Sequence, residues 1–176
     1  MTEEKKRGNL HPLVRYPNPL LNLKAEEFDF ANPPTDPIQL AYDLVECMIQ
    51  YGGIGISSCQ IGLPYRAFAL KAKESIVCFN PKVVDVFGTE VLMEEGCLSF
   101  PFAHMKIKRM SGIRVRYTEP NGNVVTTKME GLTARCFLHE LDHLDGKTFL
   151  DRASFIQKER ASKQMKKYER MRKKYR

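Results

Sequence analysis

Apolar side chains recur at helical spacing in an early stretch of the chain. Asp36 and Pro37 are typical of a helix start, and Gly52 or Gly53 is typical of a helix end. One face of the predicted helix carries Leu40, Ala41, Leu44, Val45 and Met48. The pattern therefore predicts an amphipathic helix that follows a proline-rich, extended start.

Two further helices are predicted in the last third of the chain. One runs from about Thr133 to Leu144 and ends at Gly146. Its apolar face is formed by Ala134, Phe137, Leu138 and Leu141. The other occupies the tail, where spacings of three and four connect Ala161, Met165, Tyr168, Met171 or Arg172, and Tyr175.

Between the first two helices the pattern changes to short apolar and β-branched runs. Residues 66–70, 75–79 and 82–87 are predicted to be short strands, and residues 113–118 and 124–129 two more. Pro120-Asn121-Gly122 separates the last two and is a strong hairpin signal. The predicted fold class is α+β, with mostly antiparallel strands around one central helix and a helix at each end.

Length and composition exclude several classes of protein. The chain has 176 residues, of which 43% are apolar and 28% charged, so it fits one globular domain with a core. It contains no apolar run of about 18 residues and no apolar leader, so we expect a cytoplasmic protein without a membrane partner. Its five cysteines are odd in number and widely spaced, so no disulfide scaffold is expected.

The positive charge is concentrated at one end of the chain. The net charge is +7, but residues 156–176 alone contain ten Lys or Arg and two Glu, a net charge of +8. The remaining residues therefore carry a net charge of −1, and binding of nucleic acid by the whole domain is not indicated. The tail is either a solvated helix packed on the domain or a phosphate-binding element.

The most informative segment is His139-Glu140-Leu141-Asp142-His143. On a helix, positions i and i+4 lie on one face, so both imidazoles can reach one metal ion. The carboxylate of Glu140 then lies beside that ion, where it can move a proton to or from water. The central helix is therefore predicted to bind a metal.

A third ligand is needed, and the downstream candidates are weak. The position at which one protease pattern places a histidine is Phe149, and the downstream glutamates Glu159 and Glu169 belong to the basic tail. Upstream, Cys97 follows Glu95-Gly96. A thiolate with two imidazoles leaves one position of a tetrahedron open and suits iron, zinc, nickel or cobalt.

A glycine-rich segment, Gly53 to Gln60, completes a set of three. In this order, Gly53–Gln60, Glu95–Ser99 and His139–His143 resemble the motifs G-φ-G-φ-A-A-x-Q, E-G-C-φ-S and H-E-φ-D-H of the peptide deformylase family. The resemblance covers roughly residues 10–150. It departs at Ser57 and Ser58, where the family has two alanines, so we expect the turn to survive with altered packing.

The resemblance implies a metal-dependent hydrolase that removes the formyl group from the initiator methionine of nascent polypeptides and releases formate. Cys97, His139 and His143 would bind one divalent metal ion, with Fe²⁺ expected in vivo and Zn²⁺, Ni²⁺ or Co²⁺ as alternatives. Glu140 would take the proton of the attacking water and return it to the amine. Developing negative charge on the formyl oxygen would be stabilised by the amide of Gln60 and by the backbone N–H of Leu98.

The resemblance also implies where the peptide binds. The family binds it as an extended strand, and the corresponding positions are Ile54, Gly55 and Gly96. The pocket for the methionine side chain would be lined by Met93, Leu132 and Cys136. Glu95 is expected to pair with Arg109 and so to hold the cysteine motif. Near the same motif, Phe102 and His104 replace a small residue and an arginine, and His104 is either a peptide contact or a plain surface residue.

Domain organisation and partners follow as expectations. Residues 1–153 would form the catalytic domain, and residues 154–176 a basic amphipathic helix attached to it. That helix would contact the ribosome, where formylated chains emerge, and the protein would be a monomer. Two other classes remain open at this point. A metalloprotease would cleave unformylated peptides, and a binding protein without catalysis would keep its function after loss of Glu140.

Overall fold

The strands form one antiparallel sheet in which neighbours in sequence are neighbours in space. The computed structural model describes residues 7–174. Within them the sheet order is β1-β2-β3-β4-β5. The strands are β1 (Gly55–Ser57), β2 (Ala67–Leu70), β3 (Ile76–Cys97), β4 (Phe100–Thr118) and β5 (Val124–Glu130). Because each strand pairs with the next, short connections are enough to build the sheet.

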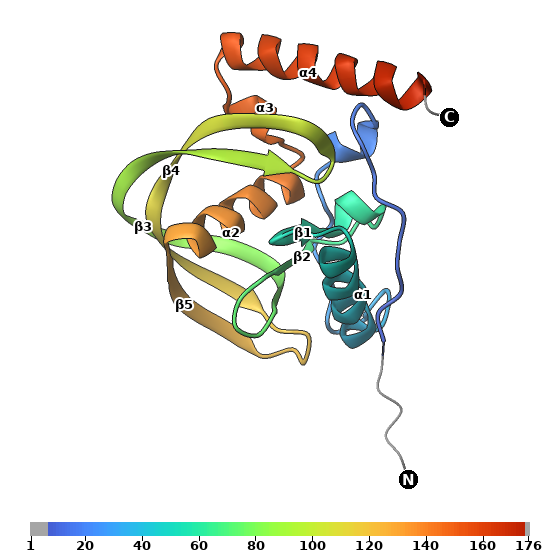
Figure 1. The fold of residues 1–176 in the computed structure, drawn as a ribbon. Coiled ribbons are helices and arrows are strands. Elements are labelled where there is room, and N and C mark those ends of the chain that lie inside the picture. The colour runs from blue at the N-terminus through green and yellow to red at the C-terminus, as the bar shows by residue number, and fades with distance from the viewer. Residues whose placement is uncertain (1–6, 175–176) are drawn as a thin grey trace.

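The helices pack around this curved sheet, and one of them lies enclosed by it (Figure 1). They are α1 (Pro37–Gln50), α2 (Gly131–Leu144), α3 (Phe149–Arg152) and α4 (Phe155–Lys174), with 3₁₀ turns η1 (Pro19–Asn22) and η2 (Ser58–Ile61). Figure 1 shows α2 in the middle, with the long curved strands β3 and β4 on one side and β1, β2 and α1 on the other. The predicted α+β class with a central helix is confirmed.

The strands predicted at 75–79 and 82–87 are one continuous strand, and this is the main error of the sequence analysis. β3 runs on to Cys97; it pairs with β2 over Ile76–Phe79 and with β4 from Phe79 to Cys97. The pairing register shifts at several places, and Asn80 and Gly88 adopt positive φ angles of 49° and 79°. Each bulge breaks the alternation of apolar and polar residues, so the pattern conceals the length of the strand.

The helix ends largely follow the sequence signals. The side chain of Asp36 accepts a hydrogen bond from the N–H of Ile38, as expected of an N-cap. Helix α2 begins at Gly131, two residues before the predicted start. After it, Gly146 has a φ of 70°, and a Cβ there would lie 2.7 Å from the carbonyl oxygen of Asn22. Only glycine fits this turn, which fixes the end of α2.

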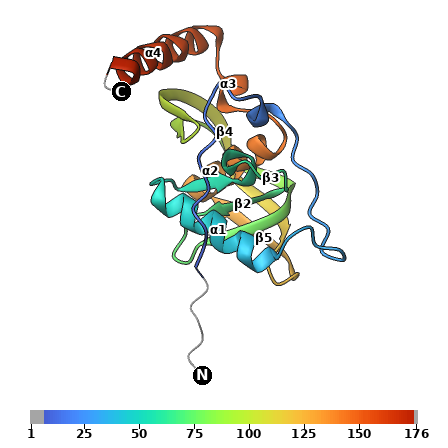
Figure 2. The ribbon, with the colours of Figure 1, turned by 90° about the vertical axis from the view of Figure 1, so that its right-hand side faces the viewer.

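The tail forms a helix that packs on β4 by part of one face. Ala161 is buried and Met165 partly buried in a cluster with Phe100 and Phe149. The last position of the predicted stripe, Tyr175, lies outside the described residues. Figure 2 shows α4 at one end of the molecule, beyond α3. No described helix is long and apolar enough to cross a membrane.

Candidate metal centre and its cavity

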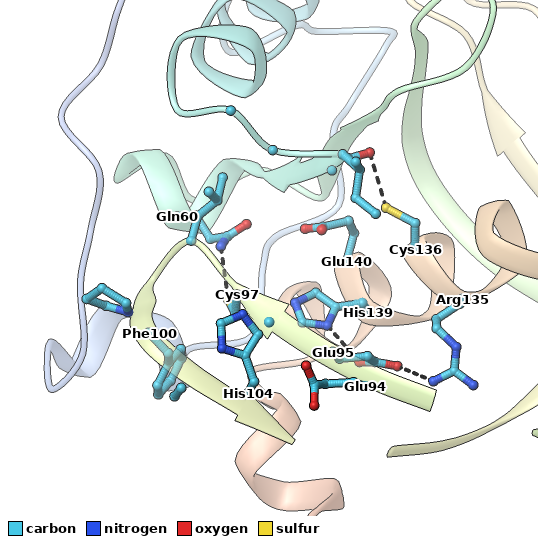
Figure 3. Close-up of a pocket in the computed structure, with 18 of the residues that line it drawn as sticks. Gln60, Glu94, Glu95, Cys97, Phe100, His104, Arg135, Cys136, His139 and Glu140 are labelled. Carbon is cyan, nitrogen blue, oxygen red and sulfur yellow. Dashed lines mark hydrogen bonds and ion pairs between the residues drawn. The ribbon is translucent and has the colours of Figure 1, made fainter. Parts of the chain in front are cut away.

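Three segments that are distant in sequence meet at one cavity of about 450 Å³. They are the segment from Gly52 through β1 to η2, the turn between β3 and β4, and one face of α2. Figure 3 shows their side chains around this space, with Glu140 pointing into it from α2. The three sequence motifs are therefore brought together.

The sulfur of Cys97 lies close to both imidazoles of α2. Ligand atoms of Cys97, His139 and His143 all lie within 4.8 Å of one another. The Cys97 Sγ is 3.2 Å from Nε2 of His143, and the two histidine rings have centroids 5.1 Å apart. One turn of α2 places the histidines on the same face. These three side chains could hold one metal ion.

A buried carboxylate orients one of these imidazoles. Glu95 Oε2 lies 3.0 Å from Nδ1 of His139, so the other ring nitrogen faces the cavity. The two oxygens of Glu95 accept hydrogen bonds from Arg109 at 2.7 and 2.9 Å, and Oε1 accepts one from Arg135 at 2.6 Å. The predicted Glu95–Arg109 pair is thus present and buried. A carboxylate behind a histidine ligand is the usual support of a metal site.

The protonation of the two histidines differs in the absence of a metal. Burial opposes the charge on His139, but the neighbouring Cys97 and Glu95 outweigh it and raise its pKa to about 10. Burial, together with the charges of His139 and Arg109, holds the pKa of His143 well below its usual range. His143 Nδ1 is buried without a hydrogen-bond partner among the described residues. A sulfur and two ring nitrogens around one space, with His139 held by a carboxylate, fit a divalent metal.

Glu140 is a carboxylate in the wall of the cavity and, among the described residues, forms no ion pair with an arginine. Its side chain is almost completely buried, and burial raises its pKa. The hydroxyl of Ser57 donates a hydrogen bond of 2.6 Å to its Oε2. A carboxylate with a raised pKa inside a cavity is suited to accept and return a proton.

Gln60 is held with its amide nitrogen toward the cysteine. Its Oε1 accepts a hydrogen bond of 2.9 Å from the backbone N–H of Ser57. Its Nε2 lies 3.4 Å from Cys97 Sγ and 3.1 Å from Ser99 Oγ. The amide can therefore donate to a negatively charged oxygen next to the metal centre.

The residues expected to contact substrate mostly line the cavity. Those found in its wall are Ile54, Gly55, Gly96, Leu98, Leu132, Cys136 and His104. Met93 does not line it, and its side chain is 42% exposed. Its expected place in the pocket is not supported.

Three residues of the site were not singled out as functional from the sequence. Arg135 precedes His139 by one helical turn and donates to both Glu95 and the carbonyl of Val91. Asp142 accepts hydrogen bonds from Arg109 and from Arg152 of α3. For Arg135 and Asp142, the available signal in the sequence was that each is a charged residue in a helix predicted to be buried, where a charge needs a partner. No signal pointed from Ser57 to Glu140, 83 residues away.

One cysteine differs from the other four. Cys97 is half-buried in the cavity wall, whereas Cys47, Cys59, Cys78 and Cys136 are buried. Burial raises the pKa of each of these four thiols. Thiolates are the reactive form, so the four buried cysteines are expected to be inert.

Comparison with known proteins gives a consistent result. A family model described as polypeptide deformylase matches residues 10–159. Peptide deformylase of Desulforudis audaxviator is 40% identical over 148 residues, which cover 83% of this chain and 95% of that protein. A crystal structure of a peptide deformylase from Legionella pneumophila has a TM-score of 0.86 at 29% identity, covering 93% of this chain and 98% of the other. A structure of the Acinetobacter baumannii peptide deformylase with Met-Ala-Ser bound has a TM-score of 0.76 at 26% identity, covering 82% and 99%.

Proposed function

The chain belongs to the polypeptide deformylase family, and we propose that the residues gathered around its cavity carry out the family's reaction. That reaction removes the N-formyl group from the initiator methionine of nascent polypeptides and releases formate. One observation carries the assignment of residues. A thiol and two imidazoles have ligand atoms within 4.8 Å of one another, and the thiol, one imidazole and a buried carboxylate with a raised pKa line the same cavity, as a metal-dependent hydrolase requires.

Cys97, His139 and His143 are the proposed metal ligands. A divalent metal, when bound there, supplies a Lewis acid that polarises the formyl oxygen and lowers the pKa of water. Fe²⁺ is the proposed native ion, and the same donor set also suits Zn²⁺, Ni²⁺ and Co²⁺. Metal analysis of protein purified without oxygen tests this choice.

Glu140 is the proposed general base and acid. It takes a proton from water as the water oxygen forms a bond with the formyl carbon. When the carbon–nitrogen bond breaks, Glu140 delivers the proton to the leaving amine, and the products are formate and a free amino terminus. Its burial favours proton uptake, because the charged form is less stable away from water.

Gln60 and Leu98 are the proposed donors to the formyl oxygen. The Nε2 of Gln60 is already turned toward Cys97, so no reorientation is required when charge develops. Leu98 follows the cysteine directly in the turn, and its side chain lines the cavity. Removing one such donor typically costs about 10²–10³ in rate.

The proposed substrate is a formylmethionyl peptide that lies along β1 and the turn before β4. Ile54, Gly55 and Gly96 line this side of the cavity and offer backbone to an extended chain. Leu132 and Cys136 provide the apolar wall for the methionine side chain. The Acinetobacter baumannii relative was crystallised with Met-Ala-Ser, the peptide that remains after removal of a formyl group.

The test of this function is formate release from formyl-Met-Ala-Ser by protein loaded with Fe²⁺ in the absence of oxygen. Acetyl-Met-Ala-Ser and unformylated Met-Ala-Ser serve as controls. Formate release with no cleavage of the controls is the expected result. Cleavage of the unformylated peptide would favour a metalloprotease, and no turnover with a full complement of metal would contradict the assignment.

Gly55 leaves no room for a side chain beside the general base, which yields a specific prediction. A Cβ at this position would lie 2.6 Å from Glu140 Oε1 and 2.6 Å from Cys136 Sγ. Gly55→Ala is therefore expected to displace the carboxylate and to lower kcat/KM by about 10²-fold. Because the end of the Glu140 side chain can move, thermal stability should change little. Steady-state kinetics and a melting curve check this, and an unchanged kcat/KM would contradict it.

We also propose that α4 is a docking element attached to a catalytic unit formed by residues 1–153, and that it contacts ribosomal RNA in the cytoplasm. The exposed basic residues of α4 include Lys163, Lys166 and Lys167. Clustered cations on one helix give a salt-dependent affinity for phosphate. The packing of Ala161 on β4 holds the helix in place.

Reversing charges on α4 is expected to separate docking from chemistry. The triple change Lys163→Glu, Lys166→Glu and Lys167→Glu should weaken cosedimentation with ribosomes by about tenfold or more at low salt. Turnover of formyl-Met-Ala-Ser should stay within about twofold, because these residues are remote from the cavity. The matched control reverses exposed lysines elsewhere, at Lys71, Lys73 and Lys82. Equal ribosome binding by both variants would contradict the docking proposal.

A further inference from the structure

The first motif of this chain departs from the family pattern at a position that touches the catalytic machinery. Ser57 is completely buried at the end of β1. Its hydroxyl oxygen lies 2.6 Å from Glu140 Oε2 and 3.3 Å from Gln60 Oε1. The alanine that the family motif has here cannot make either contact.

The single hydroxyl proton of Ser57 has a clear preferred acceptor. A hydroxyl donates one hydrogen bond, and hydrogen bonds to ionised carboxylates are shorter and stronger than those to neutral amides. Glu140 is the closer acceptor, and in its ionised form it is also the stronger one. Among the described residues, Ser57 is the one residue whose side chain donates a hydrogen bond to the Glu140 carboxylate. Glu140 therefore has one oxygen fixed by Ser57 and the other free.

Gln60 does not depend on this hydroxyl. Its Oε1 accepts a hydrogen bond of 2.9 Å from the backbone N–H of Ser57, which any residue at this position would provide. Removal of the hydroxyl therefore affects the general base and leaves the orientation of the amide in place. The hydroxyl of Ser57 therefore affects the position of Glu140, the proposed proton-transfer group, and not the position of Gln60.

We propose that Ser57 is a positioning residue that holds the Glu140 carboxylate in the orientation required for proton transfer. The inference rests on the proposed role of Glu140. In this chain the serine hydroxyl clamps Oε2, so that Oε1 stays directed at the reacting water and the leaving amine. The alanine that the family motif has at this position would provide no such clamp.

Ser57→Ala tests the clamp, with Ser58→Ala as the matched control. Ser58 is the adjacent serine and equally buried, but its hydroxyl donates to the backbone carbonyl of Tyr65, away from Glu140. Ser57→Ala is expected to lower kcat for formyl-Met-Ala-Ser by about 10- to 100-fold, as loss of one hydrogen bond to a charged group would, with KM within about twofold. Ser58→Ala should leave kcat within about twofold of the wild type.

Rescue by Ser57→Thr separates the hydroxyl from the packing. The backbone of Ser57 is extended, with φ −97° and ψ 154°, which a β-branched residue adopts readily. Ser57→Thr keeps the donor and should restore most of kcat. Metal content should be equal in all variants, because Ser57 does not touch the proposed ligands. An unchanged kcat in Ser57→Ala, an effect on KM alone, or an equal loss in Ser57→Thr would each overturn the proposal.

A crystal structure of the metal-free Ser57→Ala variant gives a reading that is independent of activity. The Glu140 carboxylate is expected to rotate or to occupy more than one orientation. A carboxylate in the wild-type position without the hydroxyl would overturn the clamp. If the wild type itself released no formate, the proposed function would fail. A fully active wild type with an equally active Ser57→Ala variant would remove only the role of Ser57.

Discussion

Replacement of Glu140 by alanine is expected to lower kcat/KM for formyl-Met-Ala-Ser by about 10³-fold or more, because Glu140 is the group proposed both to accept the proton of water and to return it to the leaving amine. The neighbouring carboxylate of Glu95 is held by Arg109, Arg135 and His139. Metal content should be retained, since Glu140 is not among the proposed ligands. Formate release and metal analysis on the same sample provide the measurement.

The control for this experiment removes a carboxylate that is far from the chemistry. Glu90 is exposed on β3 and pairs only loosely with Lys108, at 4.0 Å. Glu90→Ala should keep full activity, because an exposed pair of this kind contributes little. Activity of Glu140→Ala within tenfold of the wild type, at equal metal content, would show that proton transfer does not depend on Glu140.

Glu95→Gln is expected to be the most destabilising single change near the metal centre. Arg109, Arg135 and His139 all donate to this carboxylate, and its side chain is only 5% exposed. Removing one partner of a buried ion pair leaves uncompensated charge and costs about 3–5 kcal/mol. Loss of the support behind His139 should also weaken metal binding by about 10–100-fold. Urea unfolding of the metal-free protein and a metal titration measure the two effects separately.

The same substitution has a defined pH dependence. Burial alone would raise the pKa of Glu95, but hydrogen bonds from His139 and Arg109 lower it from 4.5 to about 2. Its contribution to the free energy of unfolding is therefore complete above the unfolded pKa and is lost as the pH falls toward 2. The difference between wild type and Glu95→Gln should be large at pH 7 and shrink below pH 4.5. Glu94→Gln, at the exposed neighbouring position, should show no such dependence. A difference that is constant with pH would contradict this account.

Local signals in the sequence were sufficient for the three long helices α1, α2 and α4 and for placing the two histidines of the candidate metal centre side by side. Asp36, Pro37 and Gly146 set helix ends by backbone geometry that depends on few neighbours. The spacing of His139 and His143 requires only a helix to bring both rings to one side. These features could be predicted because each depends on residues within a few positions of one another.

The remaining features depend on contacts between distant segments. The length of β3 is hidden by bulges, and Met93, which was expected in the pocket from the resemblance, does not line the cavity. The hydrogen bond from Ser57 to Glu140 joins residues 83 positions apart. In the sequence, Arg135 is one of several charged residues in a helix. Its partner Glu95 is brought next to it only by the fold. Only the folded chain defines these partners.

The arrangement of the cysteines also affects how the protein is inactivated by oxidation. Four thiols are buried and have raised pKa values. Cys136 lines the cavity as well, but Cys97 is the less buried of the two and is therefore the expected site of oxidation. That thiol, Cys97, is also the proposed metal ligand. The opening that admits a peptide thus admits peroxide or oxygen to the same sulfur. Oxidation of Cys97 should therefore also release the metal. The lifetime of the active protein would then depend on this one sulfur atom.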